Sequence, residues 1–229
     1  MTWRSRILTA ILAPLLLPLS LSAQGIVYRV EVGTDSVAGA FRVRAEFPVP
    51  PGHDTLLVAL PAWSPGSYEI QDYARYVHGF SASTIDGQPL FWDKLDKGTW
   101  RIATHGATRV VAEFLTDPDS VALELSRAGP DFAYFNGTNL FLYPVGGGLD
   151  FPSDVLLDVP PGWRTATGLT PTGESGHYRA ASYHDLVDSP TFLGRFAEDS
   201  VVVDGRPIRF AIWPDTAKRC VCASSVPIS

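Results

Sequence analysis

The apolar residues of this chain follow the two-residue period of β-strands. From residue 26 onward, short runs of β-branched and aromatic residues alternate with polar ones, and glycines and prolines separate the runs. Because successive side chains of a strand point to opposite faces, such runs predict strands with one buried face. No window carries a long helical period. The candidate strands are 26–32, 40–47, 55–60, 78–84, 89–92, 99–104, 109–115, 132–135, 140–143, 155–159, 177–180, 192–203 and 206–213.

Turn residues between these runs support the same interpretation. Asp86-Gly87 and Asp204-Gly205 stand where a tight hairpin requires a positive φ. Short helical turns are expected at 69–76 and 183–187. The sequence therefore predicts an all-β fold, a β-sandwich or saddle-like arrangement of antiparallel sheets with one or two short helical turns.

Residues 1–23 are typical of an export signal. Arg4 and Arg6 precede the apolar stretch 7–21, which ends in small residues suited to cleavage. The stretch is short for a membrane span, and its two prolines fit poorly in a spanning helix. We therefore expect a periplasmic or extracellular protein whose β-rich domain covers residues 24–214, with the membrane involved only through the signal.

The remaining composition limits the classes of partner. Arg4 and Arg6 belong to the 18 basic residues, so the exported part carries 16 basic against 24 acidic residues, a net charge of −8. An acidic surface without a basic stripe argues against nucleic acid. Cys220 and Cys222 both lie in the atypical tail 215–229, which we expect to be disordered or truncated, so the domain itself needs no disulfide.

Known catalytic motifs are absent from the sequence. It contains no His-Glu-x-x-His segment for zinc and no Gly-x-Ser-x-Gly nucleophile turn. A carboxylate pair as in a glycosidase is conceivable, but on an acidic protein such groups usually form a solvated face. We therefore expect no catalytic residue, no metal ligand and no cofactor in this chain. The carboxylates considered are Asp93, Asp96, Asp117, Asp119 and Glu124.

Several segments together resemble the N-terminal domain of the glycyl aminopeptidase family, zinc metallopeptidases that also carry a PDZ domain. The resemblance rests on residues 60–77, 94–102, 134–143, 161–163 with 167–169, and 183–190 with Gly194. It implies a β-rich domain followed by a thermolysin-like catalytic domain and a PDZ domain, with N-terminal glycine or alanine removed from peptides. Zinc is implied only for the catalytic domain, which is missing from these residues.

The resemblance leads to one expected function and one expected site. The function is that of a non-catalytic N-terminal domain, with the catalytic domain as its partner and the peptide substrate reached through that domain. By position, Asn136, Thr138 and Asn139 are expected to help bind the free amine of the substrate. Asn136-Gly137-Thr138 also fits a glycosylation sequon, and a purely structural turn is the alternative that we prefer to the sequon.

Two other functions remain open at this stage. A stand-alone exported β-sandwich that binds peptide or carbohydrate would have a closed polar surface and one aromatic-lined groove. A self-contained hydrolase would need a deep pocket with two converging acids. An exposed apolar face would favour the N-terminal domain of a larger enzyme.

Overall fold

The computed structural model describes residues 25–32, 39–117 and 126–213. The expected export signal, the tail 215–229, Asp119 and Glu124 lie outside the described residues.

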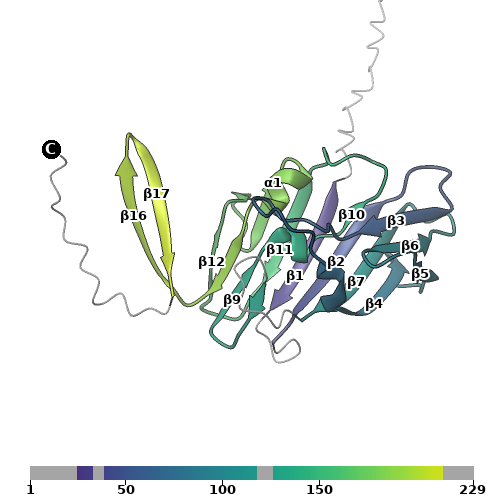
Figure 1. The fold of residues 1–229 in the computed structure, drawn as a ribbon, viewed down its shortest axis with the longest axis horizontal. Helices are drawn as coiled ribbons and strands as arrows, with labels where there is room; N and C mark the ends of the chain where they lie inside the picture. Colours follow the sequence, from purple (N-terminus) through teal and green to yellow (C-terminus); the bar gives the residue numbers. More distant parts are fainter. Residues whose placement is uncertain (1–24, 33–38, 118–125, 214–229) are drawn as a thin grey trace, which may run out of the picture.

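A seven-stranded sheet forms the base of the fold (Figure 1). Strands β1 and β11 run parallel, and all its other neighbours are antiparallel. Alternate residues of β1 and β2 are buried, as their sequence pattern predicts, so one face of the sheet is covered. The strand order is β13 (Thr170–Pro171), β14 (His177–Ala180), β11 (Ser153–Asp158), β1 (Ile26–Val32), β2 (Phe41–Pro48), β7 (Arg109–Thr116) and β4 (Val77–Thr84).

Two four-stranded sheets pack on that same face. Phe41 of β2 contacts Phe135 of one sheet, with ring centroids 5.7 Å apart, and Phe80 of β4 stacks on Trp100 of the other. The packing confirms the all-β prediction. One sheet has the order β12 (Arg164–Thr167), β15 (Thr191–Gly194), β9 (Phe132–Phe135) and β8 (Arg127–Ala128); the other has β10 (Tyr143–Pro144), β3 (Thr55–Ala59), β6 (Thr99–Ala103) and β5 (Trp92–Lys94).

A hairpin of β16 (Ala197–Val203) and β17 (Arg206–Ile212) stands apart from these sheets (Figure 1). Its turn has φ 50° at Asp204 and 75° at Gly205, as the Asp-Gly pair predicts.

In the described part of the chain, helical structure is limited to three short segments. The 3₁₀ helix η2 (Tyr73–Tyr76) covers only the second half of the helical turn expected at 69–76, while α1 (Tyr183–Val187) matches its prediction. The first half is not helical, because the Gln71 amide donates to the Ala62 carbonyl and closes a loop. The third segment is the 3₁₀ turn η3 (Gly137–Asn139). Among the described residues, no helix is long and apolar enough to cross a membrane.

The strand expected at 140–143 is wrong. Leu140, Phe141 and Leu142 are all fully buried, which a strand covered on one face does not allow for consecutive residues. The carbonyls of Phe141 and Leu142 accept hydrogen bonds from the hydroxyls of Tyr183 and Tyr28 rather than from a neighbouring strand. The segment is thus an irregular core element, and β10 begins only at its end.

Two further strand predictions need correction. The run 192–203 divides into β15 and β16, since Gly194 adopts a φ of 144° where an added Cβ would lie 2.6 Å from the Asp131 carbonyl oxygen. The strand expected at 89–92 begins at Trp92, because proline has no N–H for a ladder and Pro89 forms a single bridge to Ser83. Strands β8, β12 and β13 have no counterpart in the prediction.

Candidate functional site

The candidate site begins at the turn that follows β9. Asn136 caps η3: its Oδ1 accepts from the backbone N of Thr138 at 3.2 Å and from Thr138 Oγ1 at 3.0 Å. The Asn139 side chain donates to the carbonyl of Asn136 at 3.3 Å. The motif therefore forms a 3₁₀ turn whose polar side chains bond within the turn.

The turn is joined to a distant loop by buried hydroxyl groups. Ser64 Oγ lies 2.8 Å from Thr138 Oγ1 and 2.7 Å from the hydroxyl of Tyr73. Ser64, Thr138 and Tyr73 are all buried. Because a polar group buried away from water is costly unless it is hydrogen-bonded, these mutual bonds fix the loop and the turn together.

The loop attached in this way, residues 62–71, presents apolar side chains to solvent. Pro65 and Gly66, with φ 78° at the glycine, form a turn closed by the bond from the Ser67 amide to the Ser64 carbonyl. Beyond that turn, Tyr68 is fully exposed and Ile70 is 91% exposed. We call residues 62–71 the apolar loop. A loop with buried polar anchors and exposed apolar residues is suited to contact another protein surface.

Helix α1 packs against the same turn. An added Cβ on Gly137 would lie 2.9 Å from both the Leu186 carbonyl oxygen and the Val187 Cα, so only glycine fits there. The imidazole of His184 on α1 lies 6.4 Å from the Trp63 ring of the apolar loop. The loop, the turn and the helix therefore form one connected region.

The residues predicted to bind substrate lie within this region. Thr138 and Asn139 are buried and Asn136 is half-buried, and the hydrogen bonds above join them to one another and to Ser64. The sequence alone does not predict that the two segments meet, because Ser64 and Thr138 are 74 positions apart. Their Ser and Thr content, next to prolines and glycines, was the available signal.

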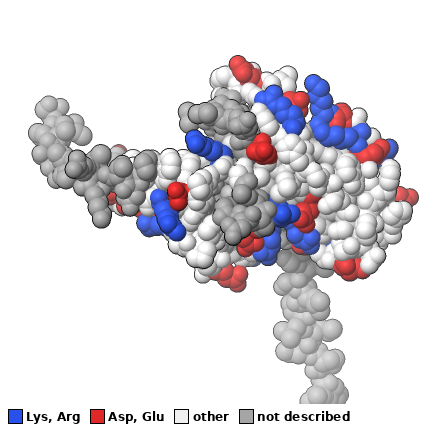
Figure 2. Space-filling view, turned by 90° about the horizontal axis from the view of Figure 1, so that it is seen from below, with Lys and Arg blue, Asp and Glu red and all other residues white. Residues whose placement is uncertain are grey.

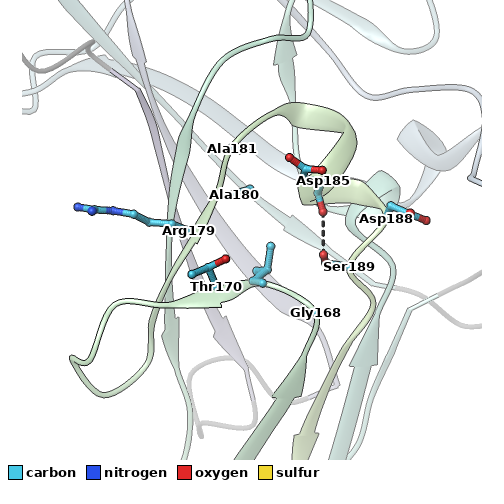
Figure 3. A pocket seen from close by; sticks show the side chains of 9 residues that line it. Gly168, Thr170, Arg179, Ala180, Ala181, Asp185, Asp188 and Ser189 are labelled. Carbon is cyan, nitrogen blue, oxygen red and sulfur yellow. Dashed lines mark hydrogen bonds between the residues drawn. The ribbon is translucent and has the colours of Figure 1, made fainter. Parts of the chain in front are cut away.

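A small cavity of about 260 Å³ lies beside α1 (Figure 3). Its charged side chains, Arg179, Asp185 and Asp188, point in different directions rather than toward one point. Ser189 Oγ donates to the Asp185 carbonyl at 2.7 Å. The cavity therefore does not bring two acids together as a hydrolase would need.

Two carboxylates considered for a catalytic pair, Asp93 and Asp96, also engage other groups. Asp93 forms a two-pronged ion pair with Arg101, and this hydrogen bond lowers the pKa of Asp93. The backbone amide of Gly98 donates a hydrogen bond to Asp96, and this bond likewise lowers the pKa of Asp96. A general acid needs the opposite shift. Within the described residues, no group of three or more His, Cys, Asp or Glu side chains is placed to hold a metal ion.

Charges of both signs are interspersed on the face shown in Figure 2, without a basic stripe.

An ionic cluster lies on the seven-stranded sheet and contains His177. Among the described residues, this is the one histidine with carboxylates beside its ring nitrogens. His177 Nε2 lies 2.7 Å from Asp154 Oδ1, and His177 Nδ1 lies 3.1 Å from Glu174 Oε2. Arg179 Nε donates to the same Asp154 oxygen at 2.9 Å.

This cluster predicts a pH dependence of stability. The hydrogen bonds with Asp154 and then Glu174 raise the pKa of His177, so the stabilisation is complete below the histidine's ordinary pKa near 6.5 and is lost as pH rises through the raised value. The loss should be below about 1 kcal/mol, as for ion pairs near the surface. Urea denaturation at pH 5.5 and 8.5 should show this decline, and His177→Gln should remove it. An unchanged pH dependence in that variant would contradict the assignment.

Comparisons with known proteins were made for sequence and for structure. The sequence model described as "Peptidase M61 N-terminal domain" matches residues 28–195. No curated protein sequence matches the chain. The crystal structure of an aminopeptidase N family protein from Idiomarina loihiensis is similar, with a TM-score of 0.74 and 25% identity over 81% of this chain. The match covers 32% of the Idiomarina chain.

Two further crystal structures show weaker similarity. Legionella pneumophila aminopeptidase A in complex with aspartic acid has a TM-score of 0.47 and 12% identity, covering 86% of this chain and 24% of its own. A two-domain M1 zinc metallopeptidase mutant bound to L-arginine has a TM-score of 0.42 and 11% identity, covering 81% and 46%.

Proposed function

The chain belongs to the Peptidase M61 N-terminal domain family, and we propose that it acts as the non-catalytic N-terminal domain of an exported zinc aminopeptidase, where it supports the catalytic domain. The single observation that carries this proposal beyond family membership is the apolar loop. Its Tyr68 and Ile70 are exposed while Ser64 at its base is tied into the core. Exposed apolar side chains on an anchored loop are suited to be covered by a second domain.

The proposed location is the periplasm or the exterior, on the basis of the export signal in residues 1–23. Zinc and the catalytic groups would belong to the catalytic domain, so the zinc ligands would be residues outside the N-terminal domain. A stand-alone module for peptide or carbohydrate would have a closed polar surface, so the exposed apolar loop favours the N-terminal domain of a larger enzyme.

The apolar loop can be tested in a fusion. Residues 25–213 replace the matching third of the Idiomarina protein, and the double variant Tyr68→Ser/Ile70→Ser is compared with the unaltered fusion. Since burying an aromatic or aliphatic side chain contributes about 1.5–3 kcal/mol, the double variant should destabilise the fusion by about 3 kcal/mol or more. Thermal or urea unfolding of the fusion measures this loss.

The matched control is Ile85→Ser, which changes an exposed apolar side chain on the turn after β4. In the chain alone, both sets of substitutions should alter the free energy of unfolding by less than about 0.5 kcal/mol. Equal effects of loop and control substitutions in the fusion would refute docking through the loop.

We further propose that the Asn136 turn lies close enough to the substrate cleft to accept hydrogen bonds from the substrate's ammonium group. In an active fusion, Asn136→Ala and Asn139→Ala should raise KM for free-amine peptides about tenfold, as for a lost bond to a charged group. Asn136→Asp keeps the acceptor that caps η3 and adds a negative charge, so it should keep or lower KM. Unchanged KM values in all three variants would leave the turn with only a structural role.

A further inference from the structure

The β16–β17 hairpin has one mainly apolar face and one face of mixed polar and apolar residues, called here the apolar face and the mixed face. Residues paired across an antiparallel hairpin share a face, and the pairing joins Val201 to Ile208, Asp199 to Phe210 and Ala197 to Ile212. The large apolar residues of the apolar face are 42–49% exposed. The first face carries the large apolar residues Val201, Val203, Ile208, Phe210 and Ile212 together with Ala197, Asp199 and Arg206, and the opposite face carries Glu198, Ser200, Val202, Pro207, Arg209 and Ala211.

The mixed face supplies most of the hairpin residues that lie beside the rest of the domain. Glu198 forms an ion pair with Arg164 of β12. A pocket of about 540 Å³ lies between the hairpin and β12. Three of the four hairpin residues that line it, Glu198, Arg209 and Ala211, belong to the mixed face, and the fourth is Phe210. The apolar face is therefore directed mainly away from the domain's own core, the reverse of what burial within this domain would favour.

The hairpin also lies outside the domain as its family is defined. The family match ends at residue 195, and β16 begins at Ala197. Among the described residues, neither β16 nor β17 pairs with a third strand, so both outer edges are open. A two-stranded hairpin is marginally stable by itself, and open edges favour pairing with further strands. At its base, Trp213 stacks on Phe132 with ring centroids 4.9 Å apart, which fixes where the hairpin leaves the domain.

We propose that the outward apolar face of the β16–β17 hairpin is an interface element that packs against the domain following it in a longer peptidase polypeptide. This inference rests on the proposed function and assigns a second docking surface, separate from the apolar loop. The occupant is a complementary apolar surface of the next domain in the same polypeptide, because the hairpin directly follows the family domain and the similar Idiomarina chain extends well beyond the matched 32%.

Hydrogen exchange tests the proposal. The amide protons of β16 and β17 should exchange at least tenfold more slowly in the fusion with the remainder of the Idiomarina protein than in the 229-residue chain. Ile208→Thr/Phe210→Thr should remove most of this added protection. Val202→Thr, a change at a more exposed position on the opposite face, should leave it intact; threonine keeps strand propensity in all three positions.

The following outcomes would overturn the proposal. Equal protection of the hairpin in the chain and in the fusion means that the next domain does not cover it. Sedimentation should show the 229-residue chain as a monomer, and a dimer lost on Ile208→Thr/Phe210→Thr would identify a second copy as the occupant. If the apolar loop is protected in the fusion and the hairpin is not, this inference fails while the proposed function stands.

Discussion

Replacing Gly137 with alanine should lower the free energy of unfolding by about 1–3 kcal/mol, the usual cost of overpacking a core. The new Cβ would lie 2.9 Å from the Leu186 carbonyl oxygen and from the Val187 Cα, and 3.1 Å from Phe141 Cδ2. Two of these atoms are backbone, so α1 or the turn must shift. Urea denaturation of the 229-residue chain measures the loss.

Gly147→Ala is the matched control, because no atom lies within 4 Å of its added Cβ. It should change the free energy of unfolding by less than about 0.5 kcal/mol. A Gly137→Ala protein as stable as this control would show that α1 and the turn are not packed as described.

Replacing Tyr28 with phenylalanine should cost about 1–3 kcal/mol, although it removes a single oxygen atom. The buried hydroxyl donates to the Leu142 carbonyl at 2.5 Å, and burial raises the pKa of Tyr28, so the hydroxyl remains a proton donor. Without it, a carbonyl of the buried segment that follows the candidate turn loses this partner. The free energy of unfolding from urea denaturation is the measurement.

Tyr68→Phe removes the same oxygen from a fully exposed ring and should leave stability unchanged. If Tyr28→Phe were as mild as Tyr68→Phe, the tyrosine would not anchor this segment. The comparison separates a buried hydrogen bond from a general effect of the hydroxyl group.

The sequence predicted most strands because one face of each is buried. Strands β9 and β14 have the predicted bounds, since the apolar run of β9 ends before Asn136-Gly137 and β14 begins directly after Gly176. The strand prediction for residues 140–143 is wrong because the apolar side chains there are buried on all sides. Tyrosine hydroxyls, rather than a neighbouring strand, donate hydrogen bonds to the carbonyls of this segment. A single sequence does not reveal that replacement, which depends on residues 114 and 42 positions away.

The candidate site was only partly accessible from the sequence. The sequence marks the segments around Ser64 and Asn136 separately. The hydrogen bonds that join them through Thr138 form only when the chain folds and brings the two segments together. The exposure of Tyr68 and Ile70 was also hidden, because aromatic and aliphatic residues usually lie in the core. The alternation in β16 and β17 predicted strands but not which face would be left uncovered.

The most direct test of the central claim is peptide hydrolysis by the fusion of residues 25–213 with the remainder of the Idiomarina protein. If this chain supports a catalytic domain, the fusion should cleave glycine- or alanine-terminated peptides at least tenfold faster than the Idiomarina protein without its N-terminal third. Circular dichroism first establishes that both proteins are folded. A folded fusion no faster than the shortened protein would contradict the account.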